Sequence, residues 1–170
     1  MTQSRGRDYP CPHEETGLFI VRLAVEKDMP QILEIERDAI SPPWSHGALL
    51  AEIYRDDSLF ALAVESGVVI GFCILRRMTD EGELLQIAVD KPYRRRGAAD
   101  ALMQAALAWA AEHGLGSVFL EVRASGIAPI ALYEKYGFRP ASRRKGYYTH
   151  PTEDALIMRL CRDGASIPVS

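Results

Sequence analysis

The sequence has few cysteines and no long apolar run. Its three cysteines, Cys11, Cys73 and Cys161, lie far apart among 170 residues, so a disulfide framework is not expected and a reducing compartment is favoured. No apolar stretch approaches the roughly 20 residues of a membrane span, and the polar first residues lack the apolar centre of a secretory signal. The sequence therefore predicts a cytoplasmic protein with no membrane partner.

The chain also lacks an excess of positive charge. Its formal net charge is −3, with 20 Lys and Arg against 23 Asp and Glu, whereas a nucleic-acid-binding domain is normally basic. No nucleic-acid partner is therefore expected. Cys11 and His13 stand two residues apart, too few ligands for a metal site, and no metal is expected. Hydrophobic residues make up 48% of the chain and charged residues 25%, as in an ordinary globular protein.

The length and the order of the expected elements favour a single domain of mixed α/β type. Residues 1–17 mix Pro, Gly and charged residues without periodicity, which predicts a flexible N-terminal arm. Residues 18–161 are expected to form one domain, and residues 162–170 a C-terminal tail. The expected order is a strand, two helices, three strands, a helix, a strand, a helix and two strands. This order predicts one central sheet flanked by helices.

Hydrophobic periodicity and turn residues locate these elements. Strands are expected at residues 18–25, 59–65, 68–77, 83–89, 117–123, 138–144 and 155–160. Helices are expected at residues 29–40, 46–55, 97–113 and 127–136. Asp28 is expected to cap the first helix. The short connectors at residues 66–67 and 79–82 predict antiparallel hairpins.

The most informative segment is residues 86–103, with the sequence QIAVDKPYRRRGAADALM. A strand ends in a basic loop that contains a glycine and opens a helix. The first N–H groups of a helix lack intrahelical partners, and the helix dipole places partial positive charge there. Arg94, Arg95 and Arg96 would each oppose that dipole by about 0.3–1 kcal/mol unless an anion bound among them. Residues 94–99 therefore predict an anion site, the alternative being a solvated helix cap.

This segment resembles the acetyl-CoA-binding motif of the GNAT N-acetyltransferase superfamily, an Arg/Gln-x-x-Gly-x-Gly/Ala loop that opens a helix. Downstream, FLEVRASGIAPIALYEKYGF and GYYTHPTEDALIM are similar to the RimI-type ribosomal-protein-alanine N-acetyltransferases. Trp44 in SPPWS fits the same group. The resemblance covers roughly residues 18–160. It implies a GNAT fold with a mostly antiparallel, twisted sheet that splays between the strands at residues 83–89 and 117–123.

The resemblance further implies that acetyl-CoA is the co-substrate and that the loop and the preceding strand bind it. Backbone N–H groups of the loop would hold the pyrophosphate, and the strand edge would hold the pantetheine arm. A main-chain N–H near Ala88 or Val89 would polarise the thioester carbonyl. The implied cofactor-binding residues are Ile87, Ala88, Val89, Arg94, Arg95, Arg96, Gly97, Ala98 and Ala99.

Glu121 and Tyr133 are the candidate catalytic residues. Glu121 interrupts the apolar strand VFLEVR, where glutamate is unfavourable, and the resemblance places the general base at this position. A carboxylate partly removed from water is a stronger base; the alternative is a strand residue that faces solvent. Tyr133 matches the residue that protonates the departing sulfur, and a tyrosine pKa of about 10 keeps the proton at neutral pH. Its alternative is a tyrosine packed on the sheet.

Trp44, Tyr147 and Tyr148 are the candidate acceptor-binding residues, because aromatic side chains combine contact area with a polar tip. Adjacent residues of a regular strand point to opposite faces, so at most one of the two tyrosines is expected to face a peptide. Gly126 stands where the RimI-type pattern has Asn, which removes one implied cofactor contact. Ser125 is a candidate cap of the helix that follows.

Three functions stay open from the sequence. The first is transfer of an acetyl group from acetyl-CoA to the N-terminal α-amine of a protein, here a ribosomal protein that begins with Ala, by direct attack in a ternary complex. The second uses a small-molecule amine or a lysine side chain as the acceptor. The third is a non-catalytic acetyl-CoA-binding sensor or partner module, against which the intact pair Glu121 and Tyr133 counts.

Overall fold

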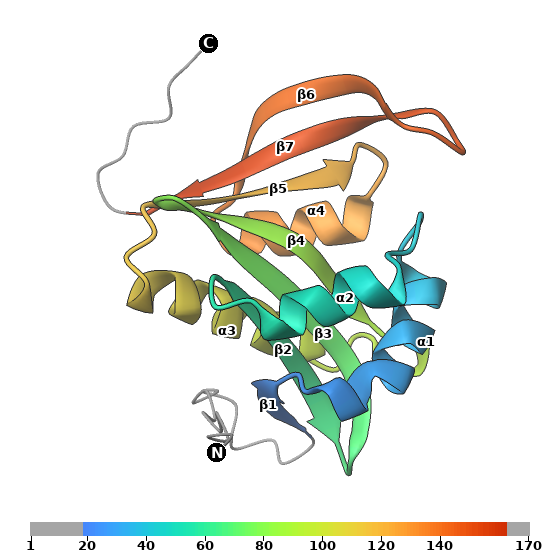
Figure 1. Cartoon of the computed structure of the whole chain (residues 1–170). Helices are drawn as coiled ribbons and strands as arrows, with labels where there is room; N and C mark the ends of the chain where they lie inside the picture. Colours follow the sequence, from blue (N-terminus) through green and yellow to red (C-terminus); the bar gives the residue numbers. More distant parts are fainter. Residues whose placement is uncertain (1–18, 163–170) are drawn as a thin grey trace. The chain divides into compact units, whose positions relative to one another are not determined.

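The computed structural model describes residues 19–162, which contain seven strands and four α-helices (Figure 1). The strands are β1 (Ile20–Leu23), β2 (Ser58–Glu65), β3 (Val68–Met78), β4 (Glu81–Val89), β5 (Ser117–Arg123), β6 (Arg139–Tyr148) and β7 (Glu153–Cys161). The helices are α1 (Met29–Ala39), α2 (His46–Tyr54), α3 (Ala98–Glu112) and α4 (Ile127–Lys135). The expected arm at residues 1–17 and residues 163–170 of the expected tail lie outside the described residues.

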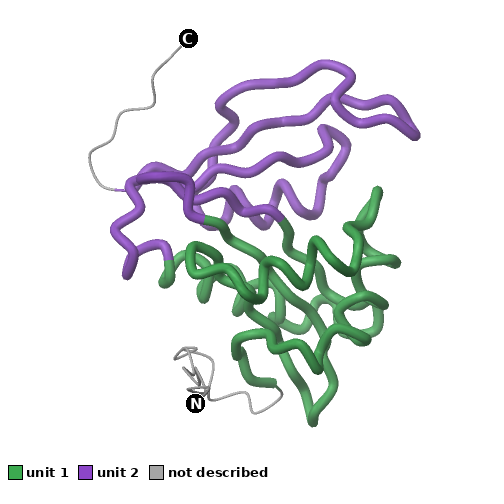
Figure 2. The backbone as a smooth tube through the Cα atoms, viewed as in Figure 1, with its two compact units in different colours: residues 1–76, 86–109 green, residues 77–85, 110–170 purple. Residues whose placement is uncertain are grey.

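The described residues form two compact units (Figure 2). The first unit contains residues 19–76 and 86–109, and the second contains residues 77–85 and 110–162. Strands β3 and β4 and helix α3 each contribute residues to both units. The single domain expected at residues 18–161 stays a prediction.

The seven strands make one mixed sheet in the order β1-β2-β3-β4-β5-β7-β6. The pairs β1–β2, β2–β3, β5–β7 and β6–β7 are antiparallel, and β4–β5 is parallel. The parallel ladder pairs residues 81–84 with residues 117–120, although β4 continues to Val89 and β5 to Arg123. A largely antiparallel sheet flanked by four helices confirms the predicted fold class.

Helix α3 lies within the helix expected at residues 97–113 and buries an apolar stripe. The buried members of the stripe are Ala98, Leu102, Ala105 and Trp109. The thiol of Cys73 on β3 donates to the main-chain oxygen of Leu102 over 3.5 Å, so the helix packs directly on this strand. Burial raises the pKa of the Cys73 thiol to about 12. Cys73 is therefore a core residue with no nucleophilic role.

Asp28 precedes α1 as predicted, but its side chain does not cap the helix. Its carboxylate oxygens accept hydrogen bonds from the Arg22 guanidinium at 2.7 and 2.8 Å and from the Val25 N–H at 3.0 Å. An ion pair with a guanidinium is a stronger interaction than a cap, so it takes the carboxylate away from the helix N–H groups. Ser45 does cap α2, because its Oγ accepts from the Ala48 N–H at 3.1 Å.

Candidate active site

The segment between β4 and α3 folds as a backbone concavity at the start of the helix. Arg95 and Gly97 adopt left-handed conformations, with φ of +63° and +87°, while α3 begins at Ala98. Alternation of backbone handedness turns successive N–H groups toward one side, which is how anion-binding nests form. A Cβ at Gly97 would meet no atom within 4 Å, so the space beside it is open. These residues fit a bound pyrophosphate.

The three arginines that look alike in the sequence have different environments. The Arg94 Nε donates to the main-chain oxygen of Val89 at 3.0 Å. Arg96 forms an ion pair with Glu65, with Nη2 and Oε1 2.7 Å apart. The exposed guanidinium of Arg95 has no hydrogen-bond or ion-pair partner among residues 19–162. Arg95 is therefore the member of the cluster whose charge is available to an anion.

The end of β4 is held by a contact that only glycine allows. A Cβ built on Gly71 of β3 would lie 2.7 Å from the main-chain oxygen of Ala88 and 3.3 Å from the Cα of Val89. The Asp90 N–H donates to the Ile70 oxygen at 2.9 Å, just beyond the end of β4. The strand segment expected to bind the pantetheine arm thus lies in direct contact with the backbone of β3.

Trp44 is fixed through its main chain to a buried carboxyl group. Its N–H donates to Glu36 Oε1 at 2.6 Å, and the same oxygen accepts from Gln86 Nε2 at 3.1 Å. Glu36 is only 1% exposed. Burial raises its pKa, and the two hydrogen bonds offset this rise only in part. Glu36 is not among the candidate residues named from the sequence, although a carboxylate on the otherwise apolar face of a helix is itself a signal.

Glu121 lies on the half-buried face of β5. The opposite face carries Val118, Leu120 and Val122, which are buried, while the Glu121 side chain is 21% exposed. Its Oε1 lies 3.0 Å from Nη1 of Arg144 on β6. This ion pair links β5 to β6.

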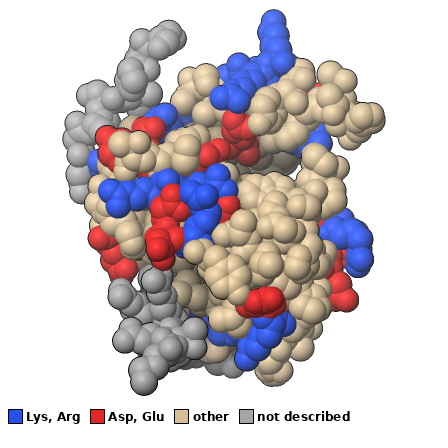
Figure 3. Space-filling model, viewed as in Figure 1, with Lys and Arg blue, Asp and Glu red and all other residues tan. Residues whose placement is uncertain are grey.

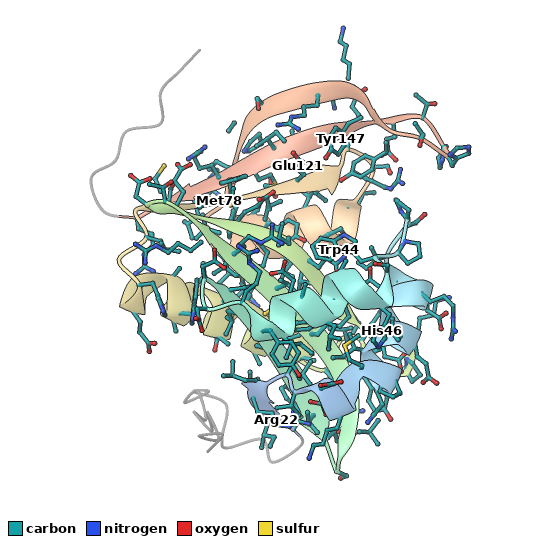
Figure 4. The ribbon with its side chains drawn as sticks, viewed as in Figure 1. Arg22, Trp44, His46, Met78, Glu121 and Tyr147 are labelled. Carbon is teal, nitrogen blue, oxygen red and sulfur yellow. The ribbon has the colours of Figure 1, made fainter. Side chains whose placement is uncertain are left out.

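Tyr147 and Tyr148 do not alternate as a regular strand requires. The pairing of β6 with β7 shifts register between Arg144 and Tyr148, where Gly146 has a φ of +58°. The two rings contact each other edge to face, with centroids 5.2 Å apart. The Tyr147 hydroxyl is hydrogen-bonded to Glu121, and this bond, with burial, raises the Tyr147 pKa. Figure 4 shows Glu121 and Tyr147 close together.

Tyr133 is buried on α4, with 7% of its surface exposed. Burial raises its pKa well above the usual range, and the nearby Tyr148 adds to this effect. Burial and the Glu121 charge likewise raise the pKa of Tyr148. The second unit therefore brings Glu121, Tyr133, Tyr147 and Tyr148 into one electrostatic neighbourhood, in which Tyr133 holds its proton at neutral pH.

The turn into α4 departs from the sequence expectation at Ser125. Gly126, not Ser125, is the cap residue, and no side chain caps the helix. The Ser125 N–H donates instead to Glu153 Oε1 at 2.6 Å. A Cβ at Gly126 would lie 3.0 Å from Pro129 Cγ and 3.1 Å from the Arg123 oxygen. Gly126 and Pro129 thus fit each other, and a larger side chain at residue 126 would displace its neighbours.

Strand β6 carries exposed basic side chains that were not singled out from the sequence (Figure 3). Its exposed basic residues are Arg139, Arg143, Arg144 and Lys145. Arg143 pairs with Asp154 at 3.4 Å, and Arg144 pairs with Glu121. The signal in the sequence was the run SRRKGYY, in which the basic residues directly precede the two candidate tyrosines.

Residues 19–162 contain no group of three or more His, Cys, Asp and Glu side chains that could hold a metal ion. In the same part of the chain, no helix combines the length and the apolar character needed to cross a membrane.

Comparison with known proteins decides the family. The acetyltransferase (GNAT) family model matches residues 29–138. The chain belongs to the GNAT acetyltransferase family. It is accordingly an acetyl-CoA-dependent N-acetyltransferase, as the resemblance predicted.

Relatives and solved structures agree with this assignment. The [ribosomal protein bS18]-alanine N-acetyltransferase of Escherichia coli (strain K12) is 38% identical over 135 residues, which cover 78% of this chain and 90% of that enzyme. The Haemophilus ducreyi enzyme of the same name is 33% identical over 144 residues, with coverages of 83% and 99%. The crystal structure of the ribosomal-protein-S18-alanine N-acetyltransferase from Escherichia coli matches with a TM-score of 0.79 and 33% identity over 90% of this chain and 99% of that one.

Proposed function

We propose that this GNAT enzyme acetylates the N-terminal α-amine of a ribosomal protein that begins with Ala, and that it does so in the cytoplasm. The observation that carries the proposal is the 38% identity to a bS18-alanine N-acetyltransferase over 90% of that enzyme's length. The hydrogen-bonded pair of Glu121 and Tyr147 supports it, because both candidate positions meet in the structure. The three widely spaced cysteines support a reducing compartment.

Acetyl-CoA supplies the acetyl group as a thioester. Backbone N–H groups of residues 94–99 bind the pyrophosphate, and Arg95 adds a charge that no other described residue neutralises. Residues 87–89 hold the pantetheine arm through their main chain. A main-chain N–H of Ala88 or Val89 donates to the thioester oxygen, where negative charge develops during acetyl transfer.

Glu121 is the general base of the proposed reaction. Only the neutral form of an amine attacks the thioester. Because an α-amino group has an ordinary pKa of about 7.7–8.0, a carboxylate suffices to accept its proton near neutral pH. Arg144 and the Tyr147 hydroxyl hold this carboxylate in place. The proton passes to Glu121 directly or through one water molecule.

Tyr133 is the general acid. Its raised pKa keeps the hydroxyl protonated, so the proton is available to the sulfur of coenzyme A as the thioester bond breaks. The amine attacks the thioester directly in a ternary complex, and no acyl-enzyme forms. Trp44, Tyr147 and Tyr148 bind the acceptor peptide through aromatic surface and hydroxyl groups.

The proposal is tested by measuring thiol release from acetyl-CoA with a lysine-containing peptide that begins with Ala. The matched substrate is the same peptide with a blocked N-terminus. We expect release only with the free N-terminus. Equal rates with both peptides would establish lysine acetylation instead, and no release with any amine despite acetyl-CoA binding would establish a non-catalytic module.

A second experiment tests the base. Glu121→Gln should lower kcat about 10²-fold or more without changing the KM for acetyl-CoA. Glu134→Gln is the matched control, because it removes an exposed carboxylate from α4 in the same unit. An unchanged kcat in Glu121→Gln across the pH range would remove Glu121 from the base role.

A further inference from the structure

We propose that Glu36 is a positioning residue for the acceptor site: its buried carboxyl group holds the Trp44 loop, residues 41–45, next to the start of the cofactor-binding segment and so sets the affinity for the peptide. The inference rests on the proposed acceptor-binding role of Trp44. Glu36 itself contacts neither substrate, and it acts only through Trp44 and Gln86.

Glu36 joins three segments that are distant in sequence. It lies in α1, its Oε1 accepts from the main-chain N–H of Trp44 eight residues later, and the same oxygen accepts from Gln86 on β4 fifty residues later. Gln86 directly precedes Ile87, the first residue of the segment expected to bind acetyl-CoA. All of these residues belong to the first compact unit.

Glu36 also accepts main-chain hydrogen bonds both just before the Trp44 loop and within it. Its main-chain oxygen accepts the Ile40 N–H at 2.9 Å, which closes the last turn of α1. Pro42 and Pro43 have no N–H group, so Trp44 supplies the first main-chain donor after Ser41. The side chain of Glu36 accepts that donor at 2.6 Å. One residue therefore ends the helix and fixes the backbone at the aromatic residue.

The packing of α1 does not require a carboxyl group at this position. Met29, Ile32 and Ile35 bury the same helix by apolar contact, whereas a buried carboxyl group is unfavourable unless it is hydrogen-bonded. Glu36 Oε2 and Gln86 Oε1 are both buried without a partner among the described residues. Two segments therefore donate to one oxygen of Glu36, and an amide at residue 36 would keep an acceptor oxygen there.

The kinetic test compares Glu36→Ala and Glu36→Leu with Glu36→Gln. Both apolar variants lose the acceptor oxygen, and leucine also retains side-chain volume. We expect them to raise the KM for the peptide roughly three- to tenfold, the effect of one lost hydrogen bond, with kcat and the KM for acetyl-CoA within about twofold of wild type. Glu36→Gln keeps the acceptor oxygen and should retain the wild-type KM for the peptide.

Ile32→Val is the matched control for loss of stability. Ile32 is fully buried on the same helix, and its side chain has no polar atom for Trp44. This variant should melt at a lower temperature and bind the peptide normally. A peptide KM that rises equally in Ile32→Val, or that rises equally in Glu36→Gln, would overturn the hydrogen-bonding role.

A spectroscopic measurement separates this inference from the proposed function. The chain has two tryptophans, Trp44 and the buried Trp109, so Trp109→Phe leaves Trp44 as the sole indole. In that background, Glu36→Leu should raise acrylamide quenching of Trp44, and Glu36→Gln should not. Unchanged quenching with an unchanged peptide KM would refute the inference. If the wild type acetylates no peptide, the proposed function fails, and the quenching comparison still decides whether Glu36 holds Trp44.

Discussion

Gly71→Ala tests whether β3 positions the segment of β4 that is proposed to bind acetyl-CoA. The added Cβ would lie 2.7 Å from the Ala88 oxygen, 3.2 Å from Val89 Cγ2 and 3.3 Å from Val89 Cα. Carbon and carbonyl oxygen atoms approach each other to about 3.3 Å, so the overlap with Ala88 is about 0.6 Å. Because this neighbour is backbone, no side-chain rotation can relieve it, and β4 must move.

The expected cost follows from that overlap. Overpacking in a core costs about 1–3 kcal/mol, and removal of glycine from a strand returns about 0.5–1 kcal/mol. The net loss is about 0–2.5 kcal/mol of unfolding free energy with a midpoint of about 1.3 kcal/mol, and that midpoint corresponds to about 3–5 °C in melting temperature for a chain of this size. Since Ala88 and Val89 bind through their main chain in the proposed function, the KM for acetyl-CoA should rise about three- to tenfold, as expected from one weakened hydrogen bond.

The assays are thermal unfolding and steady-state thiol release. Gly47→Ala is the matched control, because Gly47 lies in α2 with ordinary φ and a Cβ there would meet nothing within 4 Å. It should gain about 0.5–1 kcal/mol from helix propensity and keep the wild-type KM. A Gly71→Ala variant as stable as wild type, with an unchanged KM for acetyl-CoA, would refute the reasoning.

Three further predictions concern proton transfer, anion binding and acid stability. Tyr133→Phe should lower kcat at least about 10²-fold with an unchanged KM for acetyl-CoA, measured by thiol release; a normal kcat would exclude Tyr133 as the acid. Arg95→Ala should raise the KM for acetyl-CoA more than Arg96→Ala does, because Arg96 is already paired; equal effects would contradict the distinction. Burial alone would raise the pKa of Asp28, but hydrogen bonds from Arg22 and a backbone N–H bring it below its ordinary value. Asp28 therefore stabilises the fold above the unfolded pKa of about 3.9, and this contribution is lost as the pH falls through the lower folded value. Asp28→Asn should lower the melting temperature at pH 7 and not at pH 2. A difference in melting temperature between variant and wild type that is the same at both pH values would contradict this prediction.

Local patterns predicted much of the fold and the position of the loop. The strand at residues 117–123 has the predicted boundaries, and α3 lies within the helix expected at residues 97–113. Both elements follow from side-chain periodicity and from glycines at their ends, which depend only on neighbouring residues. The loop at residues 94–99 was recognisable for the same reason. The alternation expected for Tyr147 and Tyr148 failed because a register shift in β6 depends on pairing with β7.

The sequence by itself determined the family and the element order. The tertiary structure alone decided which partner each charged side chain takes. Asp28 pairs with Arg22 rather than with the helix, Arg96 pairs with Glu65 and leaves Arg95 available, and Glu36 binds Trp44 and Gln86. Helices and strands arise from contacts a few residues apart, whereas these hydrogen bonds and ion pairs join residues six to fifty positions apart, which only the folded chain brings together.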